Sequence, residues 1–94
     1  MAVGDAVMAL SSVSNNSFLD IQPGASVEWF VKKVFHESDV EIYLYDGSNS
    51  MLIASPTGGN YESLDTPSNN LVRLRVKNVA GSTKLIGYSA FVTK

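Results

Sequence analysis

The sequence has no cysteine and a single histidine, His36, among its 94 residues. Without cysteine, this chain forms no disulfide bond and no thiolate metal site, and it gives no redox indication of its compartment. A metal site built on one histidine would need carboxylates to complete the usual three or four ligands. These absences restrict the chemistry that the chain can offer on its own.

Charge is also scarce. Charged residues make up 17% of the chain, and seven basic against nine acidic residues give a formal net charge of −2. Lys32, Lys33, Arg73 and Arg75 are dispersed along the sequence, whereas nucleic-acid binding draws on a clustered positive field. We therefore expect no nucleic-acid partner. The surface should instead be rich in Ser, Asn, Thr and Gly.

Long apolar runs are missing as well. No segment approaches the ~18 apolar residues of a membrane span. The first residues, MAVGDAVMALSS, contain no basic side chain and place Asp5 inside their apolar run, which is unlike a signal peptide. We therefore expect no membrane partner and synthesis in the cytoplasm. The length fits one domain over residues 1–94, and the hydrophobic share of 45% predicts that it is globular.

What the chain does contain is period-two alternation of apolar and polar residues, which indicates β-strands. The alternation is clearest in residues 40–45, where Glu41, Tyr43 and Tyr45 share one face, and in LVRLRVKN, where Arg73, Arg75 and Lys77 share one face. The last segment, KLIGYSAFVTK, alternates with Leu85 and Phe91 as exceptions. Weaker strands are expected over residues 6–12, 17–22, 51–55 and 61–65.

The segment SVEWFVKKVFHE is less regular, because its apolar face shifts phase between Val31 and Val34. A shift of one residue within a strand indicates a β-bulge. Burial of both faces would give a similar pattern. A helix with Phe30, Val31, Val34 and Phe35 at helical spacing is the alternative, but the β-branched and aromatic residues favour a strand.

Segments rich in Asn, Asp, Gly and Pro separate these strands, as turns require. They are SNN (14–16), QPG (22–24), ESD (37–39), DGSN (46–49), SPTGG (55–59), TPSNN (66–70) and NVAGST (78–83). Short strands at this spacing predict an all-β fold. We expect a single antiparallel β-sandwich or jelly-roll-like domain of about eight short strands. A short eight-stranded barrel is the alternative fold.

His36 lies in the most chemically suggestive stretch, together with Glu37, Asp39, Glu41 and Asp46. A strand–turn–strand path does not force these groups to converge on the histidine, and the calcium-loop and nucleophile-elbow patterns are absent. An enzyme or metal protein built around His36 is one hypothesis. We favour a solvated polar turn with an exposed His36, and predict no enzymatic activity, no catalytic residue, no metal ligand and no cofactor.

Three aromatic residues, Trp29, Tyr43 and Tyr45, suggest a binding role. Tyr43 and Tyr45 lie on one face of one strand, where exposed rings would stack on sugar rings or pack against a partner protein. Buried rings would be the second face of a sandwich strand. We favour burial or a subunit contact over a glycan site, and keep a carbohydrate- or receptor-binding module of a phage tail or fibre as the alternative function.

Four segments of the chain resemble small all-β proteins encoded among tailed-bacteriophage virion genes: MAVGDAVMALSS, FLDIQP, EWFVKKVFHESDVEIYLYDGSNS and KLIGYSAFVTK. Such proteins often open with Met-Ala-hydrophobic-Gly-Asp, carry Gln-Pro near residue 22 and a Tyr/Phe-Asp-Gly-x-Asn-Ser segment, and close with Gly-Tyr. The corresponding positions here are Met1–Asp5, Gln22–Pro23, Tyr45–Ser50 and Gly87–Tyr88. The resemblance spans almost the whole chain.

The resemblance implies a virion structural protein, above all a decoration (cement) protein that binds the outside of the major capsid protein lattice and stabilises it. Such a protein would be made in the host cytoplasm and reside on the capsid surface. Lattice junctions favour symmetric homo-oligomers, with trimers at threefold positions. We expect residues 2–9 to act as a docking strand, because a weakly charged strand pairs readily at a sheet edge. The predicted partner-binding residues are Val3, Val7, Met8, Tyr43 and Tyr45.

Overall fold

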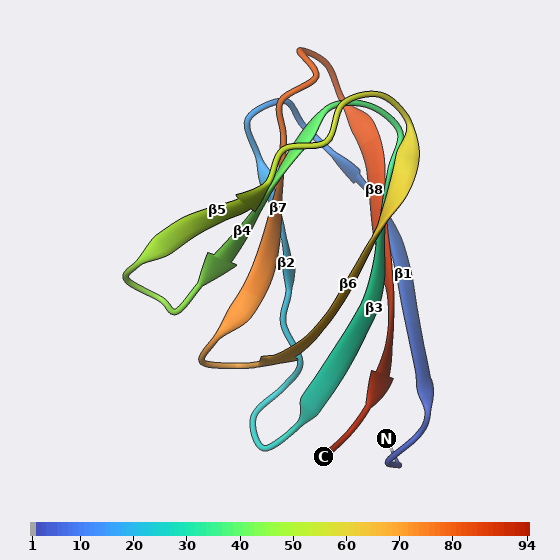
Figure 1. The fold of residues 1–94 in the computed structure, drawn as a ribbon, viewed down its shortest axis with the longest axis vertical. Coiled ribbons are helices and arrows are strands. Elements are labelled where there is room, and N and C mark those ends of the chain that lie inside the picture. The colour runs from blue at the N-terminus through green and yellow to red at the C-terminus, as the bar shows by residue number, and fades with distance from the viewer. Residues whose placement is uncertain (1) are drawn as a thin grey trace.

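The computed structural model describes residues 2–94, which form eight β-strands and contain no helix that could cross a membrane (Figure 1). The all-β prediction is confirmed, and each of the eight expected strands is present. The strands are β1 (Ala6–Val13), β2 (Phe18–Ile21), β3 (Glu28–His36), β4 (Val40–Tyr45), β5 (Ser50–Ala54), β6 (Asn60–Asn69), β7 (Arg73–Asn78) and β8 (Lys84–Val92).

The strands form two four-stranded antiparallel sheets, in the orders β1-β8-β3-β6 and β2-β7-β4-β5. Except for the β4–β5 hairpin, each strand is followed by one in the opposite sheet, which gives the strand order of a jelly roll. The topology therefore selects the jelly roll among the expected shapes. The described residues begin and end at the same end of the molecule (Figure 1).

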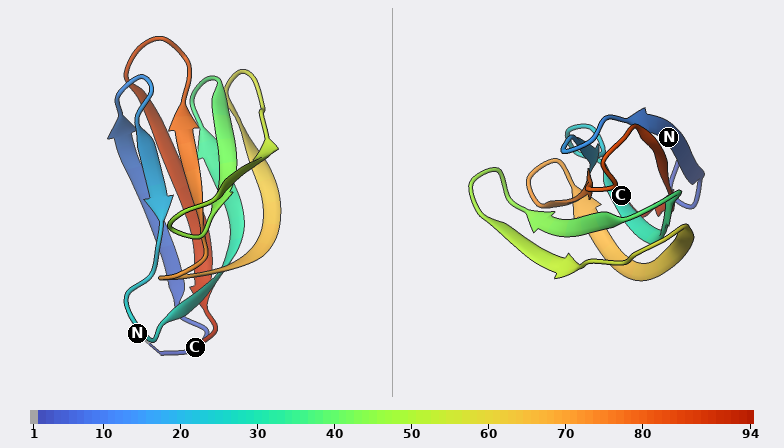
Figure 2. Two further views of the ribbon diagram at one scale, coloured as in Figure 1. Left: turned by 90° about the vertical axis from the view of Figure 1, so that its left-hand side faces the viewer. Right: turned by 90° about the horizontal axis from the view of Figure 1, so that it is seen from above.

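The core lies between the two sheets, which face each other along their length (Figure 2). Because side chains alternate across a strand, one face of each sheet points inward. Ile42 of β4, Leu74 of β7 and Ile86 of β8 are fully buried there, and Trp29 of β3 is also a core residue. Full burial of one such aliphatic side chain contributes ~1.5–3 kcal/mol, so these inward faces supply most of the stability.

The phase change in β3 is a β-bulge. The pairing of β3 with both of its neighbours shifts between Val31 and Lys33: Lys32 is the extra residue against β8, whereas Leu64 and Asp65 of β6 both lie opposite Lys32. The bulge lets Val31 and Val34 both point into the core, where both are fully buried. The helical alternative for this segment is therefore wrong. The Lys32 ammonium lies 2.7 Å from Asp65 of β6, whose backbone has a positive φ of 49°.

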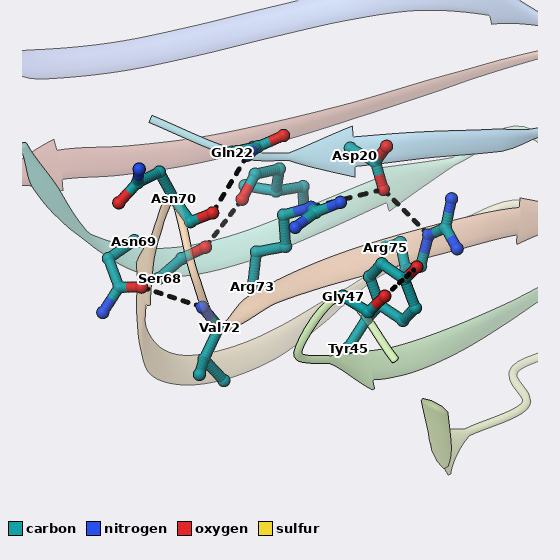
Figure 3. A network of polar contacts seen from close by, with 11 residues as sticks. Asp20, Gln22, Tyr45, Gly47, Ser68, Asn69, Asn70, Val72, Arg73 and Arg75 are labelled. Carbon is teal, nitrogen blue, oxygen red and sulfur yellow. Dashed lines mark hydrogen bonds and ion pairs between the residues drawn. The ribbon is translucent and has the colours of Figure 1, made fainter. Parts of the chain in front are cut away.

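One predicted turn is wrong: residues 66–69 of the TPSNN segment belong to β6, which runs to Asn69. Proline cannot donate to a ladder, so within sheets it is confined largely to edge strands. β6 is the edge of its sheet and tolerates Pro67 for that reason. The neighbouring Ser68 is buried, and its hydroxyl donates a hydrogen bond of 2.6 Å to the Ile21 carbonyl of the opposite sheet (Figure 3).

The β4–β5 turn has the expected chemistry. The Asp46 carboxylate accepts hydrogen bonds from the backbone N–H groups of Asn49 and Ser48 at 2.6 and 2.9 Å, and Gly47 has φ 97°. These donors, chiefly the Asn49 N–H, lower the pKa of Asp46 because they stabilise the ionised carboxylate. Asp46 therefore orders this hairpin, as turn-forming aspartates do.

Candidate interaction surfaces

The outer side of the first sheet is largely apolar, although the row between its two apolar rows is Met8–Ser89–Lys33. Directly paired residues share a sheet face, and the rows across β1, β8 and β3 pair Ala6 with Phe91 and Phe30, and Leu10 with Gly87 and Phe35. We call this surface the apolar face; its other large members are Met8, Leu85 and Tyr61. Met8 and Leu10 are 73% and 64% exposed. An exposed sheet face of this composition is typical of an interaction surface.

Aromatic pairs order the apolar face. The ring centroids of Phe30 and Phe91 are 5.4 Å apart, and those of Phe35 and Tyr61 are 6.5 Å apart. The Lys33 ammonium lies 4.6 Å from the centroid of the Tyr61 ring. Such contacts hold the rings in defined positions, so the face offers rigid anchors to a partner.

The apolar face also has a hollow. An open depression of about 400 Å³ is lined by Met8, Ala9, Leu10, Phe35 and Tyr88. The β8 residue between Leu10 and Phe35 is Gly87, where a Cβ would clash with the Ala9 carbonyl oxygen and lie 3.0 Å from Leu10 Cδ1. Glycine is therefore required for the close approach of β1 to β8 at this point.

The outer side of the second sheet has the opposite character. Its rows are Phe18–Lys77–Glu41, Asp20–Arg75–Tyr43–Leu52 and Arg73–Tyr45–Ser50, and we call this surface the charged face. Asp20 accepts a hydrogen bond of 2.8 Å from Arg75 Nε and lies 3.8 Å from Arg73 Nε (Figure 3). A single half-buried carboxylate thus lies beside two guanidinium groups.

The rings of the charged face are covered by these cations. The Arg75 guanidinium lies 4.1 Å from the Phe18 centroid and 4.3 Å from the Tyr45 centroid, and Arg73 lies 4.8 Å from Tyr45. The hydroxyl of Tyr43 donates a hydrogen bond of 2.7 Å to Glu41, which raises the pKa of Tyr43. Cation–π contacts and ion pairs therefore satisfy much of this face within the chain.

The predicted partner-binding residues do not form one surface. Val3, in the turn before β1, and Met8 are exposed, and Met8 belongs to the apolar face. Tyr43 and Tyr45 lie half-buried on the charged face, on the other side of the molecule. Val7 requires a correction, because it is 8% exposed and points into the core beside Ala90.

The predicted docking segment, residues 2–9, includes part of an edge strand, so one side of that strand is paired within the chain and the other is open. Residues 6–9 belong to β1, which is already paired with β8 over residues 6–13. The turn at residues 2–5 is closed by hydrogen bonds between Ala2 and Asp5, and Gly4 N–H donates to the Val92 carbonyl. Residues 2–5 therefore form a hydrogen-bonded turn, and residues 6–9 belong to the sheet. Met1 lies outside the described residues.

His36 ends β3 as expected, but the prediction of an exposed side chain is wrong. His36 is 4% exposed, with Nδ1 3.0 Å from the Ser38 carbonyl and Nε2 3.2 Å from Glu62 of β6. A carbonyl oxygen only accepts, so Nδ1 is the donating nitrogen. The ring therefore joins the β3–β4 turn to the edge strand β6.

The acidic residues around His36 also accept hydrogen bonds that hold the turns. Glu37 accepts a hydrogen bond from the Leu85 N–H at 3.0 Å, and Asp39 accepts one from the Gly58 N–H at 2.7 Å. Among residues 2–94, no group of three or more His, Asp or Glu side chains is placed to bind a metal ion. The arrangement stabilises the turns at this end of the sandwich.

Most residues of the apolar face are not among the partner-binding residues that the sequence predicts. Phe30, Phe35, Leu85, Phe91 and Tyr61 all contribute to it. The signal was present in the breaks of the period-two pattern, because Leu85 and Phe91 are the apolar exceptions in β8 and β3 has apolar residues on both faces. An apolar residue on the polar side of a strand is evidence for a second contact surface.

No protein-family model matches the chain, and no curated protein matches it either. Among solved structures, the chain is similar to a protein in the structure described as "Bacillus endospore appendages form a novel family of disulfide-linked pili". The two are 12% identical, with a TM-score of 0.53, and the match covers 98% of this chain and 88% of that one. This similarity shows the fold alone, and the present chain has no cysteine with which to form such links.

Proposed function

We propose that this chain is a bacteriophage virion structural protein without enzymatic activity, a decoration protein that binds the outside of the capsid lattice through its apolar face. The observation that carries the proposal is the exposed apolar face across β1, β8 and β3, in which two apolar rows flank the row Met8–Ser89–Lys33. Apolar and aromatic residues at the centre of a contact supply most of the binding energy of protein interfaces. The sequence resemblance to phage virion proteins supports the same role.

The size of the apolar face fits a protein that binds in many copies. Four strands ~4.8 Å apart, with about eight residues at ~3.3 Å each, give a face on the order of 500 Å². A stable pairwise interface typically buries ~800 Å² on each partner. One face alone is therefore a modest contact, whereas repeated copies or joined subunits on a lattice gain avidity.

The alternative of a glycan-binding or receptor-binding module has less support. Trp29 is a core residue, and the ring of Tyr45 is covered by two guanidinium groups. Sugar recognition by stacking needs an aromatic ring with a free face. The solved protein to which this chain is similar in fold comes from endospore pili, and a fold used in such an assembly is compatible with the role of a structural subunit.

The test is the copy number of the protein in purified virions of the phage that encodes it, measured by quantitative mass spectrometry. A decoration protein should be present in hundreds of copies, comparable to the major capsid protein. A handful of copies would contradict capsid decoration and favour the neck, tail or fibres. Complete absence from the particles would contradict a virion role altogether.

A further inference from the structure

The two sheets have four edge strands within the described residues: β1 and β6 in one, β2 and β5 in the other. An open edge is a template for pairing with another strand, and proteins that stay separate protect their edges. Three of these edges are protected. β2 has four residues and includes Asp20, β5 has a register shift against β4, and β6 contains Pro67 and the positive-φ Asp65.

β1 has none of these features. Its sequence, AVMALSSV, contains no charged residue, no proline and no glycine. Its pairing with β8 is continuous from Ala6–Phe91 to Val13–Lys84, without a bulge. In Figure 1 it lies at the outer margin of its sheet. β1 is therefore a long, uncharged and regular edge, the form most able to accept a further strand.

The backbone groups on the open edge of β1 follow from the register. The Asp5 carbonyl accepts a hydrogen bond from the Val92 N–H, in the same register as the rest of the pair. Hydrogen-bonding direction alternates along an antiparallel strand. The odd-numbered residues from Val7 to Val13 therefore direct their backbone groups to β8. Ala6, Met8, Leu10 and Ser12 direct theirs away from the sheet.

We propose that β1 pairs antiparallel with β1 of a second copy of this chain, about a two-fold axis that passes beside Ala9. In this register Met8 faces Leu10 of the partner and Ala6 faces Ser12 of the partner, so all four outward-facing residues are hydrogen-bonded. A two-fold interface requires a self-complementary surface, and an uncharged strand that is free of like-charge repulsion satisfies this requirement.

The pairing has a consequence for the apolar face. It joins the first sheets of the two copies into a single eight-stranded sheet. Both apolar faces then lie on the same side of that sheet. The combined face is on the order of 1,000 Å², which exceeds the ~800 Å² per partner of a standard interface. The pairing of β1 does not depend on whether the capsid is the binding partner. It predicts a two-fold dimer in place of the expected trimer.

Single cysteine variants test the register, because the chain has no thiol of its own. In Ala9→Cys, the two cysteines face each other across the axis as a non-hydrogen-bonded pair, with Cα atoms about 4.5 Å apart, within disulfide range. Ser11→Cys is the matched control on the same side of β1, because its Cα lies ~13 Å from its own copy. Mild oxidation should cross-link Ala9→Cys several-fold more than Ser11→Cys. Equal cross-linking, or more of it in Ser11→Cys, would overturn the proposal.

A second measurement needs no cysteine. Met8→Pro removes an N–H that faces away from β8, so the fold should be retained while pairing of β1 is blocked. Met8→Ala removes the side chain and keeps the N–H. Analytical ultracentrifugation over increasing concentration should show a dimer for the wild type and Met8→Ala, and a monomer for a folded Met8→Pro. A wild type that stays monomeric, forms trimers or forms open polymers would contradict the two-fold pairing.

Discussion

The two outer faces of this jelly roll are built from similar strands, but their side chains differ in chemical character. On the charged face, Arg75 Nε donates a hydrogen bond to Asp20, and Arg73 lies beside Asp20 and the ring of Tyr45, although Arg73 Nε has no hydrogen-bond partner among residues 2–94. On the apolar face, Met8 and Leu10 are mostly exposed and contact water. The charged face is thus held mainly by polar and cation–π contacts within the chain, whereas the apolar face consists mainly of exposed apolar and aromatic side chains.

This difference separates stability from binding. Exposed apolar side chains contribute little to folding, since they remain in contact with water in the folded chain. They contribute to association when a partner removes that water. Changes on the apolar face should therefore affect assembly, and changes on the charged face should affect unfolding. The predictions that follow address these two effects separately.

The largest effect is expected for Leu10→Asp, which places a carboxylate within the apolar face. Binding of the purified variant to capsids that lack the protein should weaken by more than tenfold, because a buried hot-spot residue carries ~2 kcal/mol or more. Leu52→Asp is the matched control, since Leu52 is an exposed leucine of the charged face. Sedimentation of protein with capsids measures both. Equal weakening by the two variants would contradict the assignment of the faces.

A smaller effect is expected for Asp20→Ala, which leaves two largely buried guanidinium groups without their carboxylate. The free energy of unfolding should fall by about 1–2 kcal/mol, the lower part of the range for hydrogen bonds to charged groups, because Asp20 is partly exposed to solvent. Lys32→Ala breaks the exposed pair with Asp65 and should cost less than ~0.5 kcal/mol. Urea unfolding at neutral pH compares them, and capsid binding should be unchanged in Asp20→Ala. A larger loss for Lys32→Ala would refute the ranking.

The smallest effect concerns pH and the Asp46 turn. The pKa of Asp46 is lowered in the folded chain by the Asn49 and Ser48 donors, so its stabilisation is present above the ordinary pKa of 3.8 and is lost as the pH falls through the lower, folded value. The difference in unfolding free energy between the wild type and Asp46→Ala should therefore shrink below about pH 4. Asp46→Asn keeps an acceptor oxygen without the charge and should remove this pH dependence. A pH-independent difference for Asp46→Ala would rule out the ionised carboxylate as its origin.

The strands and the bulge could be predicted because they are local. Alternation and turn residues located all eight strands, and the phase change between Val31 and Val34 located the bulge. Contacts between distant segments could not be predicted. His36 is buried because Glu62, 26 residues away, lies on the adjacent strand, and Asp20 meets Arg75 across 55 residues.

The candidate surface was predicted in part for the same reason. Met8 was identified, but its neighbours on the apolar face come from β8, β3 and β6, and only the strand order brings them together. Alternation separates the two sides of each strand and does not reveal which strands become neighbours. Val7 is an example: it is adjacent to Met8 in the sequence, but its side chain lies on the opposite side of β1 and is buried in the core.

The central claim is that the apolar face binds the capsid and the charged face does not. Hydroxyl-radical footprinting of the free and the capsid-bound protein tests it within one sample. The account predicts protection of Met8, Tyr61 and Phe91 on binding, with unchanged oxidation of Phe18 and Tyr45. Protection of Phe18 and Tyr45, with Met8 still oxidised at its free rate, would contradict it.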